Sequence, residues 1–336
     1  MRMPATAIAL AFLTAAPATA AELNLYSSRH YDTDLALYEN FTAQTGITVN
    51  LIEGEADQLM ERILSEGANS PADLLITVDG GRLHRAVEAG IFAPVDSAVL
   101  EERVPAKYQH PDNLWFGLTT RARVIYYDKS RGVPEGLADY EDLADPRWKG
   151  EVCIRSSSNI YNISLMAELI EVAGEAAAEE WARGLAANLA RAPQGGDTDQ
   201  IKAVAAGECW IGVGNTYYWG RLAASSSPED RAVAEKVGII FPNQDDRGAH
   251  VNLSGAGVVA TAPNRDAAIA FLEYLTSDEA QRIFADGNNE YPVVAGVQPS
   301  GPIGAYLDFK ASDVNASVYG TNAARAVQVY DRAGMP

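Results

Sequence analysis

The stretch Ile211-Gly-Val-Gly-Asn-Thr-Tyr-Tyr-Trp-Gly220 reads as the end of a buried strand followed by the first turns of a helix. Asn215 or Thr216 suits the helix N-cap, because either side chain can accept a hydrogen bond from an early backbone N–H group. Neighbouring side chains point to opposite faces of a strand, so Tyr217 and Tyr218 share one environment most easily at a helix start. Open α/β sheets bind ligands at the carboxyl ends of their strands. We therefore expect both phenols to face a ligand cleft.

The chain on either side of this stretch alternates short strands with helices. Residues 22–26 and 47–52 read as strands, and an amphipathic helix over about 32–45 lies between them. This order predicts a βαβ unit. Residues 114–127 are rich in strand-forming residues and contain no helix, so they are predicted to cross from one lobe to another. Residues 251–260 are predicted to cross back.

These crossings predict an α/β fold of two lobes with a ligand cleft between them. The first lobe is expected to comprise residues 21–120 and 254–298, and the second lobe residues 121–253 and 299–336. A chain of 336 residues that is 47% hydrophobic can bury a core in each lobe.

The first twenty residues differ in composition from the rest of the chain. Arg2 supplies a positive charge, residues 5–14 are apolar, and Ala18-Thr-Ala20 resembles a small-residue cleavage site. Residues 1–20 are therefore predicted to be a secretory signal, and the mature protein is expected in the periplasm. No cysteine lies near the cleavage site to carry a lipid anchor.

Cysteine content and charge narrow the class of protein further. Cys153 and Cys209 are the only cysteines, and such a pair in an exported protein is most simply a disulfide, with two buried thiols as the alternative. Cys209 is expected to begin the strand that leads to the tyrosine pair. The net charge of −19 argues against binding to nucleic acids or anionic lipids.

Seven phrases stand in a fixed order along the chain. They are Tyr26-Ser-Ser-Arg-His-Tyr31, the run Thr45 to Val49, Ser70-Pro-Ala-Asp73, Arg155-Ser-Ser-Ser-Asn-Ile-Tyr161, Gly195-Gly-Asp-Thr-Asp199, Gly214-Asn-Thr-Tyr-Tyr218 and Glu290-Tyr-Pro292. The ordered set resembles the ferric-iron-binding proteins of bacterial ABC importers. The resemblance implies a periplasmic-binding-protein fold that closes over Fe(III) and delivers it to an inner-membrane ABC permease. It implies a binding cycle of a monomer rather than an enzymatic reaction.

Carried over residue by residue, the resemblance implies a tyrosine-rich iron site. Tyr217 and Tyr218 would be adjacent phenolate ligands, Tyr161 a third and Tyr31 a fourth, with His30 beside Tyr31 as a further candidate. Fe(III) is a hard ion that suits oxygen anions such as phenolate. A free tyrosine has a pKa of about 10, so iron must displace its proton and affinity should fall with acidification.

Four phenolates around Fe(III) would leave a net charge of about −1, which nearby arginines could offset. The candidates are Arg121, Arg123 and Arg155. The remaining coordination positions are expected to be filled by His30, water or a small anion such as carbonate. Candidate contacts for such an anion are Ser156, Ser157 and Asn215.

Two other functions stay open from the sequence. A receptor of the same fold could use the tyrosines as an aromatic cage for a polyamine or another organic cation. An exported hydrolase has thin support, because Ser254 lacks the first glycine of a GxSxG motif. The second tyrosine doublet, Tyr126-Tyr127, is expected to lie in a hydrophobic strand, with one ring in the core and the other at an interface. His84, His110 and His250 lack metal-site spacing and are expected at the surface or at helix ends.

Overall fold

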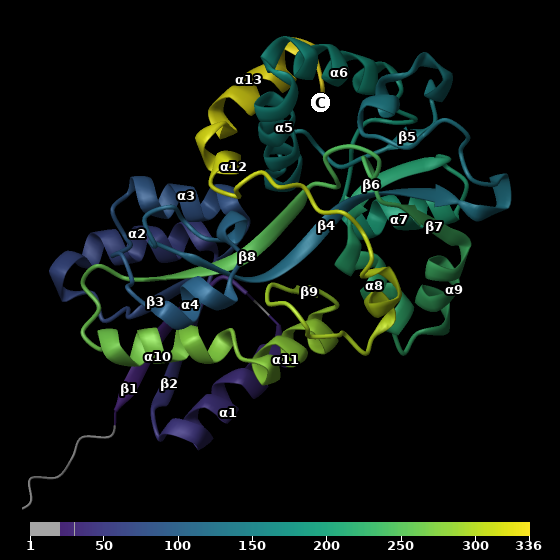
Figure 1. The fold of residues 1–336 in the computed structure, drawn as a ribbon. Helices are drawn as coiled ribbons and strands as arrows, with labels where there is room; N and C mark the ends of the chain where they lie inside the picture. The colour runs from purple at the N-terminus through teal and green to yellow at the C-terminus, as the bar shows by residue number, and fades with distance from the viewer. Residues whose placement is uncertain (1–20, 30) are drawn as a thin grey trace, which may run out of the picture.

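The computed structural model describes residues 21–29 and 31–336, so the predicted signal segment and His30 lie outside the described residues. Two α/β lobes are joined by two long strands, β4 (Phe116–Asp128) and β8 (Val251–Val258), which run between them in Figure 1. Both predicted crossings are therefore confirmed as strands. The exact lobe boundaries at 120, 253 and 298 stay a prediction.

The described strands form one sheet, in which β2-β1-β3-β8-β4-β6-β5 are neighbours and β7 and β9 also pair with β4. β1 pairs in parallel with β2 and β3, which confirms the predicted βαβ unit. The other strands have the bounds β1 Glu22–Ser27, β2 Thr48–Glu53, β3 Leu74–Val78, β5 Val152–Cys153, β6 Ile211–Asn215, β7 Val237–Ile240 and β9 Tyr291–Pro292.

Helices cover the sheet in both lobes (Figure 1). The first part of the chain supplies α1 Leu35–Thr45, α2 Ala56–Glu66, α3 Gly80–Glu88 and α4 Ala98–Arg103. The middle part supplies α5 Ile160–Ala173, α6 Glu175–Ala187, α7 Asp197–Ala205, α8 Thr216–Ala224 and α9 Pro228–Lys236. The last part supplies α10 Arg265–Leu275, α11 Asp278–Asn288, α12 Val318–Thr321 and α13 Ala323–Ala333. In the described part of the chain, no helix has the length and apolar character needed to cross a bilayer.

The strand β4 changes partners along its length. Its first half pairs with β8 up to Ala122, and its second half pairs with β6 from Arg123 and with β7 from Ile125. Side chains two residues apart lie on the same face of a strand. Arg121 and Arg123 therefore share a face of β4 while standing on opposite sides of the change of lobe.

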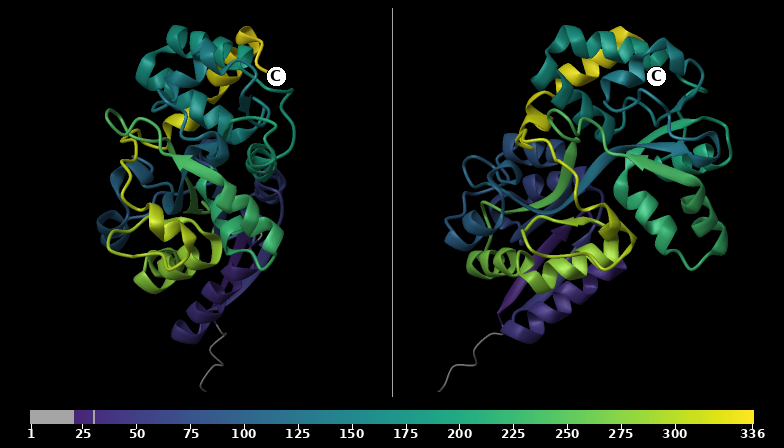
Figure 2. Two further views of the ribbon diagram at one scale, coloured as in Figure 1. Left: turned by 90° about the vertical axis from the view of Figure 1, so that its right-hand side faces the viewer. Right: turned by 45° about the vertical axis from the view of Figure 1, so that its right-hand side comes forward.

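The C-terminal helices connect the two lobes a second time. α12 contacts α3 of the first lobe and α5 of the second, and α13 packs on α5 and α6. These C-terminal helices are yellow in Figure 2. A polar contact lies beside them. Asp79, at the start of α3, accepts hydrogen bonds from Ser164 of α5 at 2.8 Å and from Asn252 of β8 at 2.8 Å. The helix α5 is thus fixed against the first lobe as well as its own.

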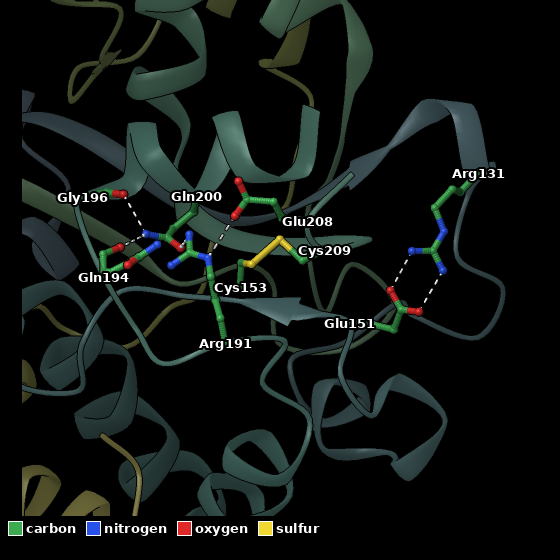
Figure 3. The surroundings of a disulfide bond; sticks show 9 residues. All are labelled: Arg131, Glu151, Cys153, Arg191, Gln194, Gly196, Gln200, Glu208 and Cys209. Carbon is green, nitrogen blue, oxygen red and sulfur yellow. Dashed lines mark hydrogen bonds and ion pairs between the residues drawn. A yellow bond between two sulfur atoms is a disulfide. The ribbon is translucent and has the colours of Figure 1, made fainter. Parts of the chain in front are cut away.

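Cys153 and Cys209 form a disulfide with a Cα–Cα distance of 6.0 Å, which confirms the predicted pairing (Figure 3). Cys153 lies on β5. Cys209 precedes β6, which begins only at Ile211, so the expectation that Cys209 begins that strand was two residues early. The backbone N–H of Ile211 donates to the carbonyl of Glu151 at 3.0 Å, and the disulfide therefore joins the two segments where their pairing starts.

Candidate metal centre

The two adjacent tyrosines lie where a strand gives way to a helix. β6 ends at Asn215, and Tyr217 and Tyr218 are the second and third residues of α8, with Asn215 as the N-cap. The predicted strand-to-helix transition is confirmed. The Asn215 side chain does not cap the helix, because its amide oxygen accepts a hydrogen bond of 2.9 Å from Nη1 of Arg123.

The other two predicted ligands also lie at the start of helical turns. Tyr161 is the second residue of α5, and its backbone N–H donates to the side chain of the N-cap residue Asn159 at 3.0 Å. Tyr31 follows β1 and precedes a short 3-10 turn, Asp32–Asp34, that leads into α1. The second lobe therefore supplies three of the tyrosines, and the first lobe supplies Tyr31.

Side chains from the two lobes converge in this region. The hydroxyl oxygens of Tyr161 and Tyr217 are 3.3 Å apart, and the rings of Tyr217 and Tyr218 stack with their centroids 4.2 Å apart. The guanidinium of Arg221 lies 4.6 Å from the ring centroid of Tyr31 and 4.9 Å from that of Tyr217. Arg221 therefore connects the tyrosine of the first lobe to the doublet of the second.

The tyrosine cluster is largely shielded from solvent. Tyr217 is only 2% exposed, and burial raises the pKa of its phenol well above the ordinary value. The neighbouring Tyr161, Tyr218 and Tyr31 raise that pKa further, while Arg121 opposes the shift. Burial likewise raises the pKa of Tyr218. Both phenols are therefore neutral at ordinary pH, and a bound cation would have to displace their protons.

A buried ion-pair network, here called the first-lobe cluster, flanks the tyrosines. It consists of Arg29, Arg121, Asp34 and Glu290. Glu290 accepts hydrogen bonds from Arg29 at 3.0 Å and from Arg121 at 2.6 Å, and Arg29 also donates to Asp34 at 2.8 Å. Burial works against ionisation of Glu290, but the two guanidiniums hold its pKa below the ordinary value.

Arg121 belongs to this cluster and also faces the tyrosines. Its guanidinium carbon lies 5.8 Å from the ring centroid of Tyr217. Its Nη2 atom donates hydrogen bonds to Glu290 and to Ser254. Its buried Nε and Nη1 atoms have no hydrogen-bond partner among the described residues. These donors are available to an oxygen acceptor.

A second buried network, here called the second-lobe cluster, lies beside the tyrosines of the second lobe. It consists of Arg123, Arg155 and Asp197. Asp197 accepts hydrogen bonds from Arg123 at 3.3 Å and from Arg155 at 3.4 Å, and the guanidinium of Arg155 lies 5.3 Å from the ring centroid of Tyr161. Of the three arginines proposed from the sequence, Arg121 and Arg155 face tyrosine rings, whereas Arg123 is hydrogen-bonded to Asn162 and Asn215, which neighbour the tyrosines in sequence.

The two candidate serines have other partners. The hydroxyl of Ser157 donates to the carbonyl of Met335 at 3.0 Å, and that of Ser156 pairs with Ser158 at 2.8 Å. Neither hydroxyl is hydrogen-bonded to a tyrosine of the cluster. Their role as anion contacts stays a prediction.

Sequence reasoning missed two features of this region. Arg221 lies four residues after Tyr217, and residues four apart share one face of a helix, so this spacing was a usable signal. His250 was expected at the surface or at a helix end, and this was wrong. It is 1% exposed, and its Nδ1 atom lies 2.5 Å from Oε2 of Glu168. Its buried position depends on α5 and on the C-terminal residues, which no local pattern reveals.

The second tyrosine doublet lies in the strand β4, as expected. Tyr126 is buried, as predicted, and its hydroxyl donates to the carbonyl of Asn215 at 2.7 Å. Within the described residues, no three His, Cys, Asp or Glu side chains gather as a metal site.

Comparisons with known proteins place the chain in a family. Residues 69–314 match the model of the bacterial extracellular solute-binding proteins. Iron uptake protein A1 of Synechocystis is 54% identical over 318 residues, covering 95% of this chain and 88% of the relative. A solved Trichodesmium IdiA (FutA) in complex with iron and citrate is 58% identical, with a TM-score of 0.92 over 94% of this chain and 100% of the other.

A more distant structure has the same fold. The ferric binding protein of Campylobacter jejuni is 41% identical, with a TM-score of 0.87 over 94% of this chain and 100% of that protein. The predicted α/β fold of two lobes joined by crossing strands is therefore confirmed. The chain belongs to the bacterial extracellular solute-binding proteins and has the periplasmic-binding-protein fold.

Proposed function

We propose that this protein binds Fe(III) between its two lobes and delivers it to the permease of an ABC importer in the inner membrane. The observation that carries the proposal is the meeting of Tyr31 from the first lobe with Tyr161, Tyr217 and Tyr218 from the second. Supporting it, the hydroxyls of Tyr161 and Tyr217 are 3.3 Å apart, close enough for both to bind one ion. The relatives named for iron uptake and ferric iron binding point to the same cargo.

The chemistry of the cluster favours Fe(III) over an organic cation. An aromatic cage binds an organic cation through open ring faces, whereas the faces of Tyr31 and Tyr217 are already covered by Arg221. Phenolate oxygens suit a hard, highly charged ion. The surrounding arginines offset the charge that four phenolates would bring.

An oxygen anion or water is proposed to complete the coordination. Buried Nε and Nη1 of Arg121 lack partners and would donate to such a group, and the Trichodesmium structure contains citrate beside iron. The protein is proposed to act as a monomer in the periplasm after removal of residues 1–20. Closure of the lobes would follow from iron contacts that only the closed state can complete from both sides.

Iron loading of the purified mature protein tests the proposal. We expect a coloured protein with about one iron per chain, because phenolate-to-Fe(III) charge transfer absorbs visible light and disappears on reduction. Tyr217→Phe and Tyr218→Phe should each weaken or shift the band. Tyr274→Phe is the matched control, because Tyr274 is a first-lobe residue that packs on Phe41 and Phe271. A wild-type protein that stays colourless and iron-free with a chelator-buffered supply would overturn the proposal in favour of an organic cation.

A further inference from the structure

Asp197 is a fully buried carboxylate that none of the proposed ligand roles uses. It is the first residue of α7, and its side chain is 0% exposed. Its Oδ2 atom accepts from Nη1 of Arg123 at 3.3 Å and from the backbone N–H of Asn215 at 2.8 Å. Its Oδ1 atom accepts from Nη1 of Arg155 at 3.4 Å. Three donors thus occupy both oxygens, so Asp197 is not available as an iron ligand.

One of these bonds leads to the tyrosine doublet. Asp197 accepts a hydrogen bond from the backbone N–H of Asn215, the last residue of β6 and the N-cap of α8, two positions before Tyr217. The approach is close, because a Cβ atom at Gly214 would lie 3.1 Å from the Cβ of Asp197. The start of α8 is therefore held against α7 by both a hydrogen bond and tight packing.

The other two bonds lead to Tyr161. The guanidinium of Arg155 lies over the Tyr161 ring. Arg123 donates from Nη2 to the side chain of Asn162 at 2.6 Å, and Asn162 follows Tyr161 in the first turn of α5. Asn162 also donates to the carbonyl of Arg155 at 2.8 Å. The carboxylate of Asp197 therefore links the first turn of α5 to the first turn of α8.

We infer that Asp197 is a positioning residue for the iron site, which fixes the spacing between the phenol of Tyr161 and those of Tyr217 and Tyr218. The inference rests on the proposed function, since the spacing matters only if the phenols bind one ion. Groups that orient metal ligands from behind typically change metal affinity by about 10–100-fold when they are removed.

If Asp197 acted on the iron site only through its charge, its removal would change iron affinity in the opposite direction from the loss of a positioning role. The second-lobe cluster has two guanidiniums and one carboxylate, so removing the carboxylate adds positive charge beside the phenols. Positive charge favours the phenolate form and would tighten iron binding. The sign of the change therefore separates a positioning role from a purely electrostatic one.

The test compares Asp197→Asn with Asp199→Asn. Asp199 lies in the same turn of α7, is exposed, and accepts only from the backbone of Gly196 at 2.6 Å. Iron affinity is measured by competition with a chelator, the charge-transfer band by visible absorption and folding by urea denaturation. We expect Asp197→Asn to weaken iron binding by about tenfold or more and to shift the band. Asp199→Asn should leave both within about twofold of wild type.

Two further variants keep the inference open to refutation if Asp197→Asn does not fold. Arg155→Gln keeps the bond between Asp197 and Arg123 but removes both the ion pair between Arg155 and Asp197 and the contact of Arg155 over Tyr161. In the Tyr161→Phe background, Arg155→Gln should have a smaller effect than in wild type, because the two changes act on one ligand. Unchanged or tighter binding in Asp197→Asn, or equal effects of Arg155→Gln in both backgrounds, would overturn the inference. A wild type that binds no iron would instead refute the proposed function.

Discussion

The first-lobe and second-lobe clusters each place an arginine against a tyrosine ring, and they differ in charge balance. The first-lobe cluster has two arginines and two carboxylates, whereas the second-lobe cluster has two arginines and one carboxylate. The excess positive charge lies in the lobe that supplies three of the four tyrosines. The charges of the first-lobe cluster balance within it, whereas the second-lobe cluster keeps one positive charge that no carboxylate of the cluster matches and that can offset phenolate charge. The two clusters thus differ in the net charge that they bring to the site, although Arg121 of the first-lobe cluster also faces Tyr217.

The largest expected effect comes from unbalancing the first-lobe cluster. Glu290→Gln keeps the shape of the side chain but leaves Arg29 and Arg121 with one carboxylate. Removing one partner of a fully buried ion pair costs about 3–5 kcal/mol, because the remaining charge is left uncompensated. Urea denaturation measures the loss of unfolding free energy. Glu175→Gln is the control, because Glu175 pairs with Arg325 and Arg332 at the surface, where solvent screening leaves such pairs with little effect on stability. Similar losses in both variants would mean that burial does not distinguish these pairs.

Removal of the disulfide, which lies within the second lobe, should have the next largest effect on stability. The bond closes a loop with a sequence separation of 56 residues beside the second-lobe cluster. Replacing Cys153 and Cys209 together by serine should lower the unfolding free energy by about 2–4 kcal/mol. Combined with Glu290→Gln, the two losses should add within about 0.5 kcal/mol, since the sites lie in different lobes. A strong departure from additivity would show that the two clusters are coupled.

Acid should reduce the contribution of Glu290 to the free energy of unfolding. The folded protein holds the pKa of Glu290 below its ordinary value of 4.5, so its contribution is fully present above that value and is lost as the pH falls through the folded pKa. The difference in unfolding free energy between wild type and Glu290→Gln should therefore be constant near neutral pH. It should narrow as the pH falls below the ordinary pKa and through the lower pKa of the folded protein. Urea denaturation at a series of pH values measures this difference, and a gap that widens in acid would contradict the assignment.

Local sequence signals were enough to predict the tyrosine segment that lies beside the two clusters. The end of β6 and the start of α8 follow from Gly214, Asn215 and the tyrosine doublet. The strands and the helix predicted for the first βαβ unit also match β1, α1 and β2 to within a few residues. The clusters were not predicted as networks. Glu290 reaches Arg29 across 261 residues of sequence, and Asp197 was noted only within a phrase. Such partners depend on how β4 changes lobes, which no pattern in a short window contains.

The smallest expected effects come from two buried hydroxyls that differ in their acceptors. Thr119 donates to the carboxylate of Glu290 at 3.0 Å, and Tyr126 donates to the neutral carbonyl of Asn215 at 2.7 Å. Hydrogen bonds to charged groups contribute about 1.5–3 kcal/mol and neutral ones about 0.5–1.5 kcal/mol. Urea denaturation should therefore give a larger loss for Thr119→Val than for Tyr126→Phe. Equal losses would mean that the arginines alone satisfy Glu290, because the hydroxyl would then add nothing that depends on its charge.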